Sequence, residues 1–184
     1  MKRLEGMAEN YFRTRNAVTF NSWTSALVAA VGSLDIEPGD EIIVSPWTMS
    51  ASAMAILHWN AIPVFCDVNK ETYCLDETQI RDKINANTKA ILAVDIFGQS
   101  SRTEKIMEIA DEYNIKVISD SAQSAGAKRN GKYAGTISHF GGISLNYHKH
   151  IHSGEGGILF TDDDELAFRA KLIRNHAESV VGPA

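Results

Sequence analysis

The sequence predicts an α/β protein, with a three-layer α/β/α arrangement around a mostly parallel sheet of about seven strands. Short apolar segments of strand length alternate with amphipathic segments of helix length along the 184 residues. Several strand segments are apolar on both faces, as expected for strands covered by helices on each side. The composition, 44% hydrophobic and 22% charged, is typical of a globular protein, and we expect one domain over residues 1–184.

Helices and strands are expected to alternate through the first part of the chain. In order, these elements are a helix at Leu4–Arg13, a strand at Ala17–Phe20, a helix after Asn21, a strand at Glu41–Val44, a helix from Ser50 to about Trp59, and a strand at Ile62–Phe65. The helix after Asn21 carries Leu27, Ala30 and Val31 on one face. Pro38-Gly39-Asp40 is a turn signal before the next strand.

The second part of the chain continues the alternation. Its expected elements are a helix capped by Asp76 and running to about Ile84, a strand at Ala90–Val94, a helix at Thr103–Tyr113, a strand at Ile115–Ile118, a hairpin at Lys128–Tyr133, strands at Phe140–Leu145 and Gly157–Phe160, and a helix at Glu165–His176. Asn130-Gly131 is the two-residue signal that marks the hairpin turn.

Polar and aromatic side chains gather where the predicted strands end. Ligands of parallel sheets bind at that edge, so these residues are candidates for a binding site. Thr24 and Ser25 stand at a helix start, where hydroxyl groups either cap the helix or help to hold a phosphate. Trp47 and Met49 follow a strand, and either belong to the core or cover a flat aromatic ligand.

Lys149 is the lysine of a polar run, Ser144 to Gly157, that joins two apolar strands. An amine held there would lose solvation, which favours its uncharged, nucleophilic form. A lysine in that role usually attacks a carbonyl to form a Schiff base, and pyridoxal phosphate is the common partner. The alternative is a solvated loop lysine without a chemical role.

A carboxylate is also needed if the ligand is a pyridine, because an ionised aspartate keeps the ring nitrogen protonated. Asp120 follows a predicted strand and shares its loop with Gln123. Asp67 and Asp95 occupy similar strand ends, so spacing alone does not choose among the three.

Other features argue against several classes of protein. The net charge is −5 and no Lys/Arg cluster appears, which disfavours nucleic-acid binding. There is no signal-peptide pattern and no apolar run of membrane-spanning length. Cys66 and Cys74 fit neither a disulfide framework nor a metal pattern, so we expect a cytoplasmic protein.

Three alternating histidines, His148, His150 and His152, offer a rival interpretation as a zinc site. They directly flank Lys149, whose positive charge would oppose a metal, and no cysteine or further acidic ligand lies at local spacing. We expect no metal here, and place the histidines in a pocket lining or at a subunit interface.

Several ordered motifs together carry a family resemblance. They are Asn21-Ser22-Trp23-Thr24-Ser25-Ala26-Leu27, Pro38-Gly39-Asp40-Glu41, Gly98-Gln99, Asp120-Ser121-Ala122-Gln123, Ser144 with Lys149, and Gly154-Glu155-Gly156-Gly157. Through them the chain resembles the DegT/DnrJ/StrS sugar aminotransferases, fold-type I enzymes that use pyridoxal phosphate, from about Leu4 to His176. The resemblance implies the large domain of the aspartate aminotransferase-like fold.

The resemblance also implies a role for each candidate residue. Lys149 would form the Schiff base and move a proton, Asp120 would pair with the pyridinium nitrogen, and Gln123 would lie against the ring. The phosphate would be held by Thr24, Ser25 and Ser144. Two positions depart from the family pattern. Met49 stands where an aromatic residue commonly covers the ring, with Trp47 just before it, and Trp23 replaces a small residue.

The implied reaction is transfer of an amino group from glutamate or glutamine to a nucleotide-linked keto-sugar, for aminosugar biosynthesis, in a homodimer. Some relatives are sugar dehydratases in which histidine replaces the Schiff-base lysine; Lys149 disfavours that alternative. Family members also begin earlier and continue beyond Val180–Ala184 through a small carboxyl-terminal domain. A second hypothesis is therefore a catalytically incompetent cofactor-binding or assembly domain, with weak cofactor binding and self-association.

Overall fold

A computed structural model describes residues 1–178, so the chain end at 179–184 lies outside the described residues. Seven strands form one sheet in the order β1-β9-β8-β5-β4-β2-β3. They are β1 (Asn16–Phe20), β2 (Glu41–Val44), β3 (Ile62–Phe65), β4 (Thr88–Val94), β5 (Lys116–Asp120), β8 (Phe140–Ser144) and β9 (Gly157–Thr161). Strand β9 runs antiparallel to both of its neighbours, and the other pairs are parallel. The predicted mostly parallel sheet is confirmed.

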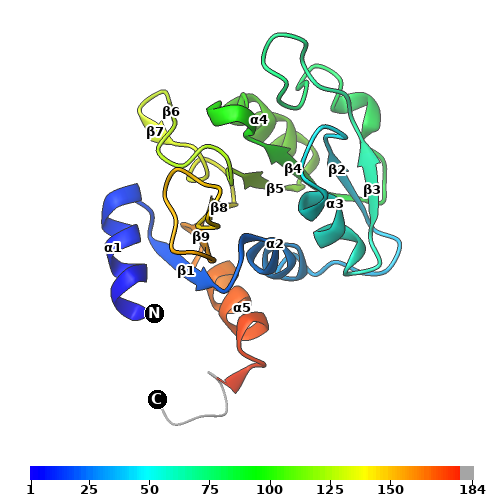
Figure 1. Ribbon diagram of the computed structural model, residues 1–184. Helices are drawn as coiled ribbons and strands as arrows, with labels where there is room; N and C mark the ends of the chain where they lie inside the picture. The colour runs from blue at the N-terminus through cyan, green and yellow to red at the C-terminus, as the bar shows by residue number, and fades with distance from the viewer. Residues whose placement is uncertain (179–184) are drawn as a thin grey trace.

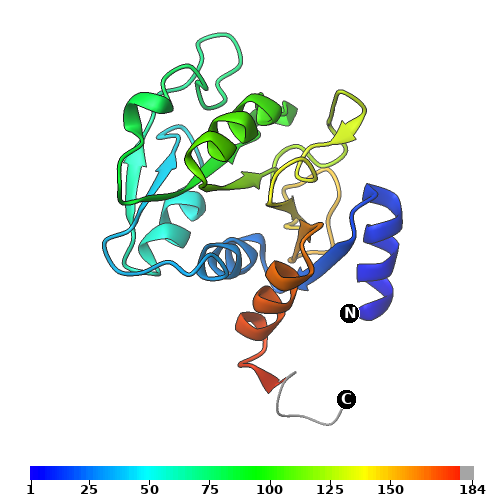
Figure 2. The ribbon, with the colours of Figure 1, turned by 180° about the vertical axis from the view of Figure 1, so that it is seen from behind.

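Helices cover both faces of this sheet, which confirms the predicted three layers (Figures 1 and 2). The described helices are α1 (Lys2–Phe12), α2 (Trp23–Gly32), α3 (Ser50–Leu57), α4 (Thr103–Tyr113) and α5 (Asp164–Arg174). Helices α2, α3 and α5 pack on one face, and α4 packs on the other. A short hairpin of β6 (Lys128–Arg129) and β7 (Lys132–Tyr133) stands apart from the sheet.

Side chains along each strand alternate between the two faces of the sheet, so the sheet has a hydrophobic core on each face. In β2, Ile42 and Val44 belong to the core under α2 and α3, whereas Ile43 belongs to the core under α4. All three side chains are fully buried. Because alternate side chains point to opposite faces, a strand covered on both sides must be apolar throughout, as the sequence indicated.

Helix α1 covers the remaining part of the sheet and protects its edge. Phe12 packs on Phe160 with ring centroids 4.7 Å apart. The carboxylates of two α1 residues accept hydrogen bonds from the free edge of β1: Glu9 from the Ala17 amide at 3.1 Å, and Glu5 from the Thr19 amide at 3.0 Å. Occupied amides cannot pair with another strand, so α1 blocks edge-to-edge association there.

One expected element is wrong. The helix from Asp76 to Ile84 does not form, and only a 3-10 turn at Arg81–Lys83 is present. The Asp76 carboxylate accepts bonds from the amide of Thr78 at 3.1 Å and from its hydroxyl at 2.7 Å. Such local side-chain bonds stabilise a turn in competition with helix.

The other expected elements are present with small shifts at their ends. Strand β5 extends through Asp120, two residues beyond the expected end, and α5 stops at Arg174 rather than His176. Among the helices within residues 1–178, none combines the length and apolar character needed to cross a bilayer.

Candidate active site

A cavity of about 390 Å³ lies at the carboxyl ends of the parallel strands, where the sequence predicted a ligand site. It contains six of the eight predicted site residues, which come from four separate parts of the chain. They are Thr24, Met49, Asp120, Gln123, Ser144 and Lys149. The other two predicted residues, Ser25 and Trp47, are not among the described residues that line this cavity. The fold therefore brings most of the predicted site together.

The start of helix α2 forms one wall of the cavity. Its cap is Ser22, whose hydroxyl oxygen accepts the Ser25 amide at 3.1 Å and lies 2.9 Å from the Ser25 hydroxyl. The capping role considered for Thr24 and Ser25 therefore belongs to Ser22. Thr24 is exposed and lines the cavity, at a helix end whose dipole favours an anion.

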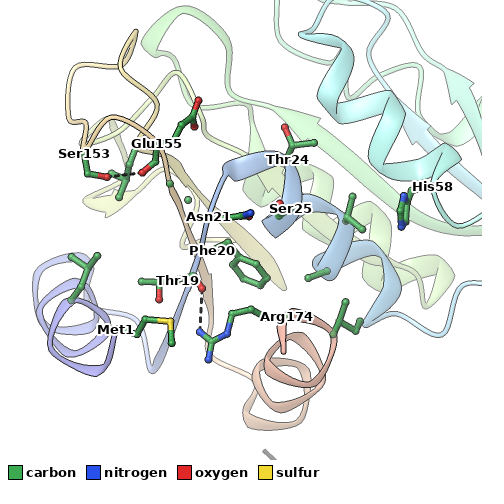
Figure 3. Close-up of a pocket in the computed structure, with 17 residues that line it drawn as sticks. Met1, Thr19, Phe20, Asn21, Thr24, Ser25, His58, Ser153, Glu155 and Arg174 are labelled. Atoms are coloured by element: carbon green, nitrogen blue, oxygen red, sulfur yellow. Dashed lines mark hydrogen bonds between the residues drawn. The ribbon is translucent and has the colours of Figure 1, made fainter. Parts of the chain in front are cut away.

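Ser25 instead faces a neighbouring, larger cavity of about 880 Å³, which Figure 3 shows between α1, α5 and the start of α2. Thr24 lines both cavities. In the larger one, the Arg174 guanidinium donates to the Thr19 carbonyl at 3.1 Å and to Glu5 at 2.8 Å. The charge of Arg174 is thus partnered within the protein.

Asp120 forms part of the cavity wall at the end of β5 and is 5% exposed. Its Oδ1 accepts the Trp23 indole N–H at 2.6 Å and the Ala122 amide at 3.2 Å, and its Oδ2 accepts the Ser52 hydroxyl at 2.7 Å. Burial raises the pKa of Asp120, while these hydrogen bonds and the charge of Lys149 oppose that rise. The carboxylate is thus buried, with two donors on Oδ1 and one on Oδ2.

Two of these donors, Trp23 and Ser52, were missed as site residues by sequence reasoning. Ser52 is fully buried in α3, and its hydroxyl also lies 2.8 Å from that of Thr48. A serine on the buried face of a helix was the available signal for Ser52, since a buried hydroxyl needs a partner. For Trp23, the available signal was that a large side chain stands where the family pattern has a small residue.

The other two strand-end aspartates lie outside the cavity. Asp95 is fully buried and accepts the Ser101 amide at 2.6 Å and the Ser121 hydroxyl at 2.5 Å. Burial raises the pKa of Asp95 to about 6. Asp67 is exposed and accepts the neighbouring Val68 amide at 2.7 Å. Of the three carboxylates that spacing could not separate, Asp120 is the one lining the cavity.

Lys149 is half-buried in the loop that joins β8 to β9. Backbone bonds continue from the strands into this loop, with the Leu145 amide donating to the Gly156 carbonyl at 2.8 Å and the Tyr147 amide to the Gly154 carbonyl at 2.9 Å. The Lys149 amide then closes a turn on the Asn146 carbonyl at 2.9 Å. The loop is therefore held by hydrogen bonds on both sides of Lys149.

The residues proposed to lie against the ligand ring are Gln123, Met49 and Trp47. The Gln123 side-chain oxygen accepts the Phe97 amide at 3.0 Å, which ties the loop after β4 to the loop after β5. Met49 lines the cavity although its side chain is 67% exposed. Trp47 is 53% exposed, and its amide donates to the Ser45 hydroxyl at 3.0 Å.

The loop histidines do not assemble a metal site. Within residues 1–178, no group of three or more His, Cys, Asp or Glu side chains is arranged to hold a metal ion. The His148 ring instead lies against Tyr147, with ring centroids 3.8 Å apart. His148 lines the main cavity beside Lys149, as expected for a residue of the pocket lining.

Comparison with known proteins identifies a family that this chain matches. The model of the DegT/DnrJ/EryC1/StrS aminotransferase family matches residues 1–182. GDP-perosamine synthase of Caulobacter vibrioides is 36% identical over 165 residues, which cover 90% of this chain and 44% of that protein.

Solved structures agree with that match. The aminotransferase of Psychrobacter cryohalolentis superposes with a TM-score of 0.94 at 32% identity, covering 100% of this chain and 47% of that one. A GDP-4-keto-6-deoxymannose-3-dehydratase, solved with a trapped PLP-glutamate geminal diamine, gives a TM-score of 0.92 at 29% identity, covering 99% and 49%. The chain thus spans about half the length of the relatives it matches.

Proposed function

The chain belongs to the DegT/DnrJ/EryC1/StrS aminotransferase family, and from this premise we propose that it takes part in pyridoxal phosphate-dependent amino transfer to a nucleotide-linked keto-sugar. The observation that carries the proposal is that one cavity is lined by an amine, a buried carboxylate and two hydroxyl groups. These groups belong to Lys149, Asp120, Thr24 and Ser144.

These groups match the parts of pyridoxal phosphate. The cofactor carries an aldehyde, a pyridine nitrogen and a phosphate, and when bound it supplies an electron sink. The aldehyde needs an amine, and the pyridine nitrogen needs a carboxylate. The phosphate needs a helix amino terminus with hydroxyl groups. A donor-rich environment around Asp120 also fits a carboxylate that has to be ionised inside the protein.

Each residue would have a defined task. Lys149 would hold the cofactor through its amine and move the proton that amino transfer requires. Asp120 would keep a proton on the ring nitrogen. Thr24 and Ser144 would bind the phosphate, helped by the dipole of α2. We keep Ser25 in this set, although its hydroxyl would have to exchange its bond with Ser22 for one with the phosphate.

The ring itself needs cover on its faces. We assign Gln123 to one side, because its bond to the Phe97 amide fixes it beside the cavity. Of the two candidates for the other side, Met49 is favoured over Trp47, since Met49 lines the cavity. A thioether packs well against an aromatic ring.

The substrates are proposed from the relatives. The similar GDP-perosamine synthase suggests a nucleotide-linked sugar as acceptor, and the neighbour with trapped PLP-glutamate suggests glutamate, or the related glutamine, as donor. The latter neighbour is a dehydratase, so that reaction is the second candidate. The presence of Lys149 favours amino transfer over dehydration.

A homodimer in a reducing, cytoplasmic setting is the proposed form of the protein. Cys66 and Cys74 are buried free thiols, as expected in such a compartment. Large apolar side chains in the loops around the cavity are more than half exposed, which suits an edge covered by further protein. They are Trp47, Met49, Phe97 and Tyr147. Sedimentation analysis of the chain tests this proposal, and a monomer would contradict it.

Chemical trapping tests the proposed cofactor site. Pyridoxal phosphate is added to the 184-residue protein, borohydride reduces the imine, and peptide mapping locates the modified lysine. We expect modification at Lys149 and its loss in Lys149→Arg. The matched control is Lys132→Arg, which changes an exposed lysine of the hairpin and should leave the labelling intact. Labelling of another lysine, or of none in a folded sample, would contradict the assignment.

A further inference from the structure

We propose that Trp23 is a positioning residue that fixes the orientation of the Asp120 carboxylate, so that one oxygen, Oδ2, is left to face the cofactor. The proposal rests on the cofactor site proposed above, but its central contact is present in the protein by itself. That contact is the hydrogen bond from the Trp23 indole to Asp120 Oδ1, at 2.6 Å.

The acceptor capacity of the Asp120 carboxylate is limited. Each carboxylate oxygen has two lone pairs, about four acceptor positions in all. Oδ1 of Asp120 already accepts the Trp23 indole and the Ala122 amide, so both of its positions are filled. Oδ2 accepts only Ser52 among the described residues. A further donor in the cavity can therefore be accepted at Oδ2.

Packing holds the indole in this place. Trp23 is 5% exposed, at the first turn of α2 against β8 and β9. A Cβ added at Gly142 would lie 2.5 Å from its Cζ3, and one added at Gly157 would lie 2.7 Å from its Cα. Gly142 thus leaves the room that the indole fills, and Gly157 lets β9 approach the backbone at the start of α2. A side chain packed this closely has little freedom to release Asp120.

Opposing influences act on the pKa of Asp120. The charge of Lys149 favours the ionised carboxylate. Burial is the largest influence and raises the pKa of Asp120. The charge-assisted bond from the buried Trp23 indole, like that from Ser52, favours the ionised form without bringing in a further charge.

The first test uses the cofactor-free protein. It has three tryptophans, whose indole N–H signals serve as probes in NMR. Trp47 is exposed, and the Trp59 indole donates to the Val28 carbonyl at 2.8 Å. We expect the Trp23 signal to be protected from hydrogen exchange and to move when Asp120→Asn is introduced. Exchange as fast as that of Trp47 would overturn the proposal.

The second test adds pyridoxal phosphate to the same sample. If Trp23 positions Asp120, the indole signal stays protected when the cofactor binds. If the ring nitrogen instead displaces the indole, the protection is lost and the proposal is wrong. Absence of any cofactor binding would count against the proposed function, whereas the measurement on the cofactor-free protein would still decide the Trp23–Asp120 arrangement.

The third test removes the donor and keeps the aromatic ring. Trp23→Phe should raise the pKa of Asp120, followed through the carboxyl-carbon signals of labelled aspartate, by about one to two units. It should weaken pyridoxal phosphate binding about tenfold. Trp59→Phe, which removes another buried indole donor, is the matched control and should change neither quantity. An unchanged pKa of Asp120 in folded Trp23→Phe would contradict the proposal.

Discussion

The indole of Trp23 donates a 2.6 Å hydrogen bond to the carboxylate of Asp120, a residue 97 positions later in the chain. Trp23 begins helix α2, and Asp120 ends strand β5. The bond joins the helix that forms one cavity wall to the strand that forms another. Helix packing and the chemistry of the candidate site are therefore linked at this point.

Asp120→Asn should abolish most of the amino-transfer half-reaction, because a neutral amide cannot keep the ring nitrogen protonated. We expect a rate loss of about 100-fold or more with partial retention of pyridoxal phosphate. The measurement is the absorbance change of the bound cofactor on addition of glutamate. Asp67→Asn, at an exposed strand end, is the matched control and should react normally. Equal losses in both variants would contradict the assignment of Asp120.

Asp95→Asn should change how stability depends on pH. The pKa of Asp95 is raised from 3.8 to about 6 by burial, so the folded protein binds this proton more tightly than the unfolded chain. Its carboxyl group therefore destabilises the folded state progressively as pH rises from about 4 to 6, by on the order of 3 kcal/mol.

Asparagine does not ionise. The free energy of unfolding of Asp95→Asn, measured relative to the wild type, should therefore be higher at pH 7 than at pH 4. Urea unfolding at the two pH values measures this difference. The charge of Asp120 also raises the pKa of Asp95, so the expected difference includes the interaction between these two carboxylates. An effect of Asp95→Asn that is equal at pH 4 and pH 7 would show that the carboxyl group is not destabilising in this way.

Gly32→Ala should destabilise the fold at the contact between α2 and Trp59. The added Cβ would lie 2.1 Å from Cζ2 of Trp59, whose indole is held by its bond to the Val28 carbonyl. We expect a loss of about 1–3 kcal/mol in the free energy of unfolding. Gly6→Ala in α1 is the control, since nothing lies within 4 Å of the added Cβ. It should gain about 0.5–1 kcal/mol from helix propensity.

Glu5→Gln should weaken the attachment of α1 to the sheet. Although burial by itself raises its pKa, bonds from Thr19 and Arg174 outweigh this and hold the pKa of Glu5 below its ordinary value. The stabilisation is thus present at neutral pH and is lost as pH falls through that lowered pKa.

We expect Glu5→Gln to lose about 1–3 kcal/mol at pH 7, and less at pH 3, in chemical unfolding. Glu37→Gln changes an exposed carboxylate and should be close to neutral. A second readout is the association state, because the Thr19 amide at the sheet edge loses part of its protection. Equal stability of the two variants at pH 7 would contradict the role given to Glu5.

Much of the fold was predictable because it depends on local periodicity. Strands such as Glu41–Val44 and helices such as Thr103–Tyr113 occur with the bounds that the sequence predicted. The helix expected after Asp76 failed for a reason that is also local. The Asp76 side chain bonds to Thr78 and stabilises a turn, a competition that an apolar pattern does not reveal.

The sequence by itself determined the alternating strands and helices, the loop that carries Lys149, and the set of polar residues at strand ends. Tertiary structure decided which of these residues meet. It placed Asp120 in the cavity and left Asp67 and Asp95 outside, although all three end or follow strands. The bond between Trp23 and Asp120 likewise depends on how α2 packs against the sheet. Contacts between residues so distant in sequence follow from the packing of whole elements, which periodicity along the chain does not specify.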